Sequence, residues 1–192
     1  GLIGSGKGTV ADYLIDQHSF QKISFADKLK DAVSEMFDWP RPMLEGITPQ
    51  SRAWRERPDQ FWSQEFGRDI TPRYVLQVFG TECMRKGFYD GIWVSLVKKR
   101  IQENPTVNWV IPDTRFPNEV DMVKSVGGQV WCIKRGKNPK WFDDYKHLSI
   151  EPKNIHASEW AWANADFDHV IQNDTTLDKL HLKVLDCLTD QQ

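Results

Sequence analysis

The chain opens with Gly1-Leu2-Ile3-Gly4-Ser5-Gly6-Lys7-Gly8-Thr9, a run that satisfies the pattern G-x-x-x-x-G-K and then reads Gly-Thr. Glycines at these positions let consecutive backbone N–H groups turn inward around an anion. Val10, Leu14 and Ile15 follow at helical spacing, so a helix N-terminus adds its positive dipole. The run predicts a phosphate-binding loop in which Lys7 reaches the phosphates as a mobile charge.

A glycine-rich turn with a solvated lysine would satisfy the same loose pattern. The rest of the chain is therefore needed to distinguish such a turn from a phosphate-binding loop. Short apolar runs alternate with amphipathic helices along the chain, which predicts a parallel sheet with right-handed crossovers. The expected strands are residues 20–24, 107–111, 129–133 and 169–171. The expected helices are residues 25–37, 71–83, 91–103, 117–126 and 177–188. The loop motif should follow a buried strand, and we expect that first strand to be missing from this chain.

Two segments do not follow this alternation. Residues 39–70 contain four prolines and predict an irregular connection with short helices, whereas residues 134–156 are polar and aromatic without periodicity. Most of the tryptophans lie in or beside these segments, where flat side chains could stack on a base or exclude water. They are Trp39, Trp54, Trp62, Trp141, Trp160 and Trp162.

Composition excludes several classes of protein. The 25 basic and 27 acidic residues give a net charge of -2, which argues against a protein that coats a nucleic-acid polymer or an anionic membrane. The three cysteines show no C-x-x-C spacing, which disfavours a disulfide framework or a zinc site and is typical of the reducing cytosol. No apolar run approaches the roughly 20 residues of a membrane span. The 192 residues therefore predict a single cytoplasmic domain.

Polar clusters follow three of the expected strands, at residues 26–28, 113–115 and 134–135. Because ligands bind beyond the carboxyl ends of the strands in an open parallel sheet, these clusters should share one rim with the glycine loop. A chance glycine turn would not predict that convergence.

Longer strings of residues point to a family. The chain resembles the deoxynucleoside monophosphate kinases of tailed bacteriophages, a branch of the P-loop nucleoside monophosphate kinases. The strings Leu-Gln-x-x-Gly-Thr-Glu and Asp-x-Arg-x-x-x-Glu are more specific than the loop. The resemblance rests on residues 1–9, 25–30, 73–82, 93, 111–119, 156–159 and 171–174.

The resemblance implies an α/β fold, a P-loop kinase three-layer sandwich with a central parallel sheet, whose first strand the family places immediately before Gly1, plus a small lid. Residues 1–192 would form one kinase domain, with 38–70 as an acceptor-binding insertion and 134–156 as the lid. The implied reaction is ATP-dependent phosphoryl transfer with Mg²⁺ to a deoxynucleoside 5′-monophosphate, giving the dNDP and ADP. The enzyme would act in the host cytoplasm if phage-encoded, without binding a nucleic-acid polymer or a membrane. A homodimer stays open, because some tryptophans exceed what a single core needs.

The resemblance also assigns roles to residues. ATP would be held by the loop and by an arginine at the lid, which are Gly4, Ser5, Gly6, Lys7, Gly8, Thr9 and Arg135. Magnesium would be held by Thr9 and Asp113. The acceptor would be bound by Asp27, Lys30, Arg73, Gln77 and Arg115. Catalysis would fall to Lys7, Arg115, Arg135 and Asp113.

Each role has a structural alternative. Arg115 could form a surface ion pair with Asp113 or Glu119, and Asp113 could orient that arginine rather than hold magnesium. Arg73 could be a solvated first-turn residue, and Asp27 a helix cap. His156 and Glu159 are assigned a structural role beside Ser158.

One pair of residues depends on helix geometry. Gln77 and Glu82 are five residues apart, and on an α-helix they do not share a face closely. Gln77 alone is therefore taken as the reader of the acceptor base.

Two other functions remain as alternatives. A P-loop kinase for another small phosphorylated acceptor, such as dephospho-coenzyme A or phosphomevalonate, would share the loop and the fold. A non-catalytic nucleotide-binding protein would share the loop but would not need Arg73 and Arg115.

Overall fold

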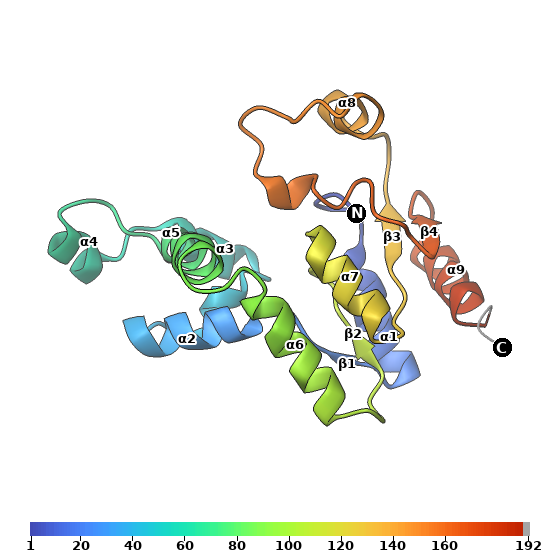
Figure 1. The fold of residues 1–192 in the computed structure, drawn as a ribbon, viewed down its shortest axis with the longest axis horizontal. Coiled ribbons are helices and arrows are strands. Elements are labelled where there is room, and N and C mark those ends of the chain that lie inside the picture. The colour runs from blue at the N-terminus through green and yellow to red at the C-terminus, as the bar shows by residue number, and fades with distance from the viewer. Residues whose placement is uncertain (190–192) are drawn as a thin grey trace. The chain divides into compact units, whose positions relative to one another are not determined.

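The computed structural model describes residues 1–189 and divides the chain into two compact units. The first unit comprises Gly1–Ser24 and Arg100–Gln192, and the second comprises Phe25–Lys99 (Figure 1).

The first unit contains short parallel strands joined by helices (Figure 1). Strand β1 (Gln21–Lys22) pairs with β2 (Trp109–Val110), and β3 (Trp131–Lys134) pairs with β4 (His169–Gln172). Helix α7 (Pro117–Ser125) connects β2 of the first pair to β3 of the second. The alternation predicted from the sequence is therefore confirmed as a mixed α/β fold, although these strands form two separate two-stranded sheets.

An apolar cavity of about 450 Å³ borders both strand pairs of the first unit. The segments that line it include 107–112 around β2, 127–131 before and within β3, and the first turns of α1 (Lys7–His18). Lys7 is among the lining residues, so the phosphate loop borders this cavity.

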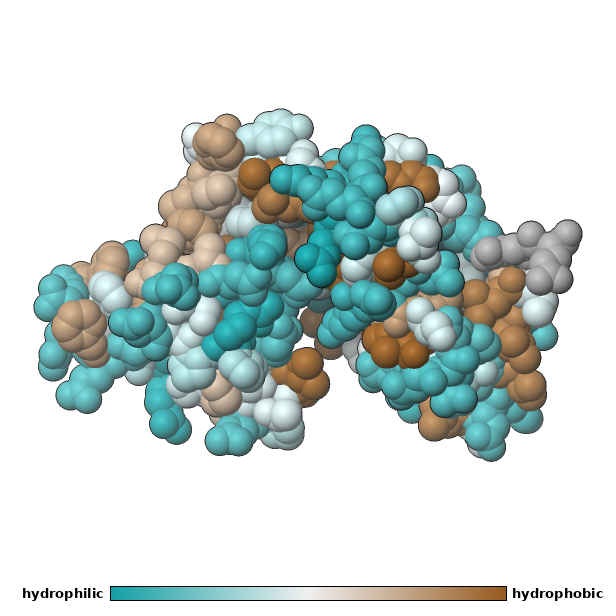
Figure 2. Space-filling view, turned by 90° about the horizontal axis from the view of Figure 1, so that it is seen from below, coloured by the Kyte–Doolittle hydropathy of each residue, from teal (hydrophilic) through white to brown (hydrophobic). Residues whose placement is uncertain are grey.

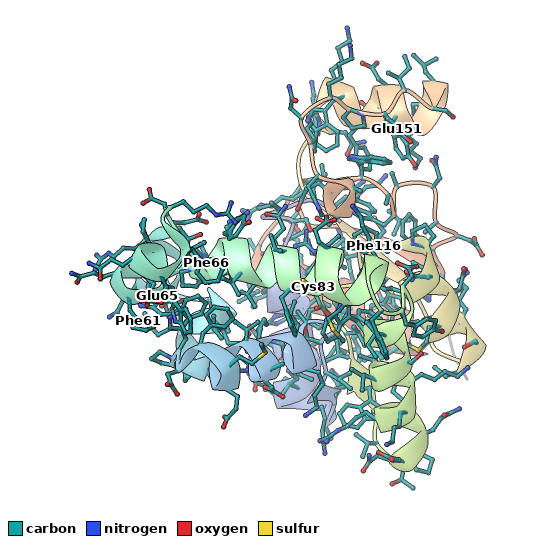
Figure 3. All side chains as sticks on the ribbon, turned by 60° about the vertical axis from the view of Figure 1, so that its left-hand side comes forward. Phe61, Glu65, Phe66, Cys83, Phe116 and Glu151 are labelled. Carbon is teal, nitrogen blue, oxygen red and sulfur yellow. The ribbon has the colours of Figure 1, made fainter. Side chains whose placement is uncertain are left out.

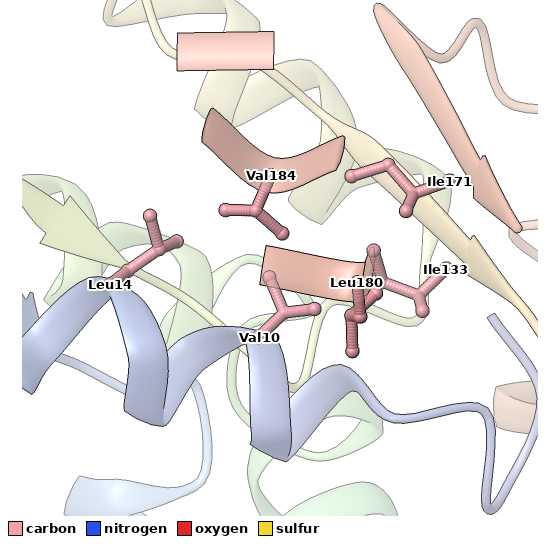
Figure 4. Close-up of a cluster of buried hydrophobic side chains, with 6 residues drawn as sticks. All are labelled: Val10, Leu14, Ile133, Ile171, Leu180 and Val184. Atoms are coloured by element: carbon pink, nitrogen blue, oxygen red, sulfur yellow. The ribbon is translucent and has the colours of Figure 1, made fainter. Parts of the chain in front are cut away.

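The core of the first unit lies between its first and last helices and the β3–β4 pair. Helix α9 (Leu177–Thr189) packs with α1 on these strands, and both helices contribute apolar residues four apart (Figure 4). The buried cluster comprises Val10, Leu14, Ile133, Ile171, Leu180 and Val184. This packing fixes the start of α1 against the ends of β3 and β4.

Residues 134–156 differ from the sequence interpretation. The segment contains helix α8 (Lys140–Leu148), followed by the 3₁₀ turn η3 (Ala157–Glu159). Phe142 of α8 is buried against Trp162 and Cys132. The expectation of an aperiodic segment was wrong, since Trp141, Phe142 and Tyr145 recur at helical spacing and pack in one cluster.

The second unit is helical. It contains α2 (Asp27–Phe37), η1 (Arg41–Glu45), α3 (Pro49–Glu56), α4 (Gln60–Phe66), α5 (Pro72–Gln77) and η2 (Val78–Lys86), and most of α6 (Ile92–Glu103). The short helices predicted within residues 39–70 are confirmed. The hydroxyls of Thr48 and Thr71 and the carboxylate of Asp59 cap α3, α5 and α4 by accepting a hydrogen bond from a first-turn backbone N–H.

Tryptophans build the core of the second unit. Trp39 is 5% exposed, stacks on Phe37 at 4.7 Å between ring centroids, and lies edge-on to Trp54. Its indole N–H donates to Asp59 Oδ2 at 2.9 Å, and the indole of Trp62 donates to Phe37 O. The idea that these rings stack on a base is therefore wrong for Trp39, whose faces are already covered by protein.

The surface carries scattered apolar side chains. Leu177, Leu182 and Leu185 on α9 are exposed, and apolar residues are scattered among hydrophilic ones on the face in Figure 2. Phe61 and Phe66 of α4 are also exposed (Figure 3). Within residues 1–189, no helix has both the length and the apolar character needed to cross a membrane.

The core of the first unit gives a matched test of burial. Leu180 is 1% exposed and Leu182, on the same helix, is 60% exposed. We expect Leu180→Ala to lower the free energy of unfolding by about 3 kcal/mol, because it leaves a cavity, and Leu182→Ala to lower it by less than about 0.5 kcal/mol. Urea denaturation measures both values, and equal losses would contradict the packing of α9.

Candidate functional site

The phosphate loop has the backbone that its glycines predict. Gly4 and Gly6 have φ angles of 77° and 101°, a left-handed region that favours glycine. Ser5 N donates to Leu2 O, and Val10 N donates to Gly6 O where α1 begins. The free N–H groups of the first turn of α1 therefore point toward the loop, the arrangement that binds an anion.

Lys7 extends back over the loop. Its ammonium donates to Gly1 O at 2.7 Å and to Leu2 O at 2.8 Å. Burial lowers the pKa of Lys7, and the positive charge of Arg115 lowers it further, while Glu159 acts in the opposite direction. The structure therefore brings together a lysine from the loop and an arginine from beyond β2, as the sequence predicted for two cations at one rim.

The loop also has a partner that the sequence reasoning missed. Asn173, directly after β4, donates through Nδ2 to Ser5 O at 2.9 Å. The string Ile171-Gln172-Asn173-Asp174 contributed to the resemblance, but no role had been assigned to it. Ser5 Oγ is buried and has no hydrogen-bond partner among the described residues.

Asp113 lies after β2, beside Ser24, which lies after β1. Ser24 Oγ donates a hydrogen bond to Asp113 Oδ2, and both residues take part in further interactions. This contact joins the ends of two neighbouring strands, which is where the parallel sheet predicts a polar rim. Ser24 was not identified from the sequence, because its only signal was its position at the end of an expected strand.

Arg115 has a partner other than the two considered from the sequence. Its guanidinium Nη1 donates to Glu159 Oε1 at 2.6 Å, whereas its backbone N–H donates to Glu119 Oε2 at 2.6 Å. Glu119 is buried and also accepts the N–H of Phe116, so it caps the start of α7. The guanidinium therefore has an ion-pair partner, Glu159, that the sequence did not reveal.

Arg135 follows β3 and is exposed. Within residues 1–189, its side chain forms no recorded hydrogen bond or ion pair, in contrast to Arg115. It lies between Lys134, the last residue of β3, and Gly136, whose φ is 64°.

Four of the predicted acceptor-side residues, Asp27, Lys30, Arg73 and Gln77, lie in the second unit, whereas Arg115 lies in the first. Arg73 is 62% exposed and pairs with Glu56 at 2.7 Å, and Lys30 pairs with Glu45 at 2.7 Å. Asp27 lies 3.7 Å from Arg41. Burial alone would raise the pKa of Glu45, but the hydrogen bonds from Lys30 and Arg41 hold it below its ordinary value. The charged groups on α2 and η1 thus form a connected network.

The helix that carries Gln77 has an unusual geometry. Helix α5 continues directly into η2, a nine-residue π-helix that carries Cys83 (Figure 3). In a π-helix, backbone bonds span five residues, as where Gly87 N donates to Glu82 O at 3.0 Å. Gln77 ends α5, one residue before η2 begins, and the choice of Gln77 over Glu82 as the base reader stays a prediction. Both side chains are exposed.

The residues around the phosphate loop are suited to bind the phosphates and the Mg²⁺ that a kinase would need. The loop offers backbone N–H groups, and a Cβ at Gly8 would meet no atom within 4 Å. Magnesium keeps several waters and takes one or two carboxylates plus substrate phosphates. One carboxylate, Asp113, and one exposed hydroxyl, Thr9, are compatible with that mode of binding. The described residues contain no cluster of three or more His, Cys, Asp or Glu side chains suited to a metal.

Comparison with known proteins identifies the family. The profile of the family "Deoxynucleotide monophosphate kinase" matches residues 59–184. A protein of Acanthamoeba polyphaga mimivirus, provisionally named deoxynucleotide monophosphate kinase, is 32% identical over 96% of this chain and 91% of its own length. The deoxynucleoside-5′-monophosphate kinase of Escherichia phage T5 is 30% identical over 51% of this chain, an alignment that spans 36% of the phage protein. The chain therefore belongs to the deoxynucleotide monophosphate kinase family, which confirms both the resemblance seen in the sequence and the prediction of a phosphotransferase.

Proposed function

We propose that the protein transfers the γ-phosphoryl group of ATP to a deoxynucleoside 5′-monophosphate, giving a dNDP and ADP. The observation that carries this proposal is a phosphate loop covered by the Lys7 ammonium, together with a second cation in the same unit, Arg115, which follows β2. Phosphoryl transfer requires two anionic substrates to be held together and the charge on the transferred group to be stabilised. A protein that only binds a nucleotide needs the loop but not the second cation.

The loop and its cations would act on the donor. The N–H groups of Gly4, Ser5, Gly6, Gly8 and Thr9 would bind the phosphates of ATP, with Lys7 as a point charge on the β- and γ-phosphates. Bound Mg²⁺ would neutralise charge on these phosphates, and Thr9 and Asp113 would hold it. Arg115 would exchange its contact with Glu159 for a phosphate oxygen, which its planar fork can grip with two hydrogen bonds.

The acceptor would be bound by the second unit. Arg73 would bind the acceptor phosphate, and its partner Glu56 is solvent-exposed, so the ion pair costs little to exchange. Gln77 would read the base, and Asp27 and Lys30 would act near the nucleoside or its phosphate. Residues 38–70 would form the acceptor-binding segment, and residues 134–156 the lid, with Arg135 at its start.

A panel of acceptors tests the reaction directly. We expect ADP release from ATP to depend on Mg²⁺ and to be stimulated by at least one dNMP. NMPs, dephospho-coenzyme A and phosphomevalonate serve as competing acceptors in the same coupled assay. Absence of stimulation by every dNMP would overturn the proposed reaction, and stimulation by dephospho-coenzyme A or phosphomevalonate alone would reassign the acceptor.

The phosphate loop is tested by Lys7→Ala. We expect turnover to fall by at least about a hundredfold, because the charge on the β- and γ-phosphates is lost, while the melting temperature stays close to that of the unaltered protein. Lys179→Ala, an exposed lysine on α9, is the matched control and should keep normal turnover. Normal activity of Lys7→Ala would exclude the loop from the reaction.

Two variants distinguish a role of Arg115 in phosphoryl transfer from a purely structural role of its ion pair with Glu159. We expect Arg115→Ala to lower kcat about a thousandfold, as loss of an arginine from a phosphoryl-transfer site does. Glu159→Gln should have a much smaller effect on kcat, because it leaves the guanidinium in place. Steady-state kinetics and thermal unfolding distinguish the outcomes. Equal losses of stability in the two variants, with kcat unchanged, would show that the pair is only structural.

A further inference from the structure

Asn173 lies directly against the phosphate loop. Its Nδ2 donates to Ser5 O at 2.9 Å, and a Cβ built on Gly6 would lie 2.3 Å from the same nitrogen. Gly6 also has a φ of 101°, so a side chain at position 6 would strain the backbone and would have to displace the Asn173 amide. The loop conformation is therefore fixed from outside by the end of β4.

The same end of β4 holds the backbone on both sides of Arg135. Asn173 N donates to Lys134 O at 2.7 Å, and Asp174 Oδ1 accepts the N–H of Gly136 at 2.6 Å. The first contact continues the parallel register, in which Lys134 pairs with Gln172. The second is a charge-assisted bond, which is shorter and stronger than a bond between neutral groups.

These contacts join two parts of the candidate site through two consecutive residues. The loop is held at Ser5, and the residue to either side of Arg135 is held at its backbone. The side chain of Arg135 is free to turn, since within the described part of the chain it has no recorded partner. Its Cα, in contrast, is fixed relative to the loop.

We propose that Asn173 and Asp174 are positioning residues that set the distance between the phosphate loop and Arg135. This proposal rests on the proposed function, in which both parts bind ATP. Arg135 then reaches the phosphates from a fixed backbone, and only the chain beyond Gly136 can move as a lid. Gly136, with its φ of 64°, marks the boundary between the fixed and the movable part.

Substitutions of Asn173 test the hold on the loop. We expect Asn173→Ala to raise the Kd of a fluorescent ATP analogue about fivefold, the worth of one hydrogen bond. Asn173→Asp should weaken binding more than Asn173→Ala, because it places a carboxylate opposite the carbonyl of Ser5. Asn164→Ala, an exposed asparagine of the same unit, is the matched control. A lowered melting temperature with unchanged Kd for both Asn173 variants would overturn this half of the proposal.

Substitutions of Asp174 test the hold on Arg135. We expect Asp174→Ala to lower kcat about tenfold, and Asp174→Asn, which keeps an acceptor oxygen, to restore most of the loss. If Asp174 acts through Arg135, then Asp174→Ala should add almost nothing in an Arg135→Ala background. Independent, additive losses in the double variant would overturn the coupling.

Lys7→Ala, measured in the same experiments, distinguishes a failure of the proposed function from a failure of the positioning role alone. Retained ATP binding and turnover in Lys7→Ala would sink the proposed function, and the positioning role with it. Loss of turnover in Lys7→Ala, together with unaltered Kd and kcat in the Asn173 and Asp174 variants, would overturn the positioning role alone.

Discussion

At Gly6 the backbone turns in the left-handed region and lies so near Asn173 that a single extra carbon would collide with the amide. The rest of the first unit depends on this close approach. Helix α1 begins one residue later, and Val10 and Leu14 on its buried face pack with α9 and the β3–β4 pair. The loop, the helix dipole and the strand ends are therefore parts of one packed arrangement, and a shift in any of them would move the phosphate-binding N–H groups.

The charges around the loop show why the first unit can bind an anion. Lys7 is buried enough for its pKa to fall, and Arg115 adds a second positive charge nearby. Two carboxylates balance this charge, and one of them also accepts hydrogen bonds from the backbone. Glu119 caps α7 and so fixes the backbone of Arg115, whereas Glu159 pairs with its guanidinium. One carboxylate thus positions the arginine, and the other neutralises it.

The core of the second unit is built from short helices. Helices of five to nine residues, which make up most of this unit, bury little surface each, so large aromatic side chains compensate. Trp39 and Trp62 contact Phe37 of α2, and Trp54 of α3 contacts Trp39. The π-helix η2 follows from close packing as well, since a Cβ on Gly80 would lie 2.7 Å from Leu29 and the carbonyl of Gly80 accepts the indole N–H of Trp93.

Local features of the sequence determined much of this architecture. The glycine loop, the threonine cap of α5 and the apolar periods of α1, α2 and α9 depend on residues within a few positions of one another, so they can be read from spacing alone. The strings shared with the family were sufficient to identify it.

The tertiary structure alone decided the contacts between distant residues. Asn173 is 168 residues from Ser5, and Glu159 is 44 residues from Arg115. No period or motif specifies such pairs, because they depend on how whole helices and strands pack.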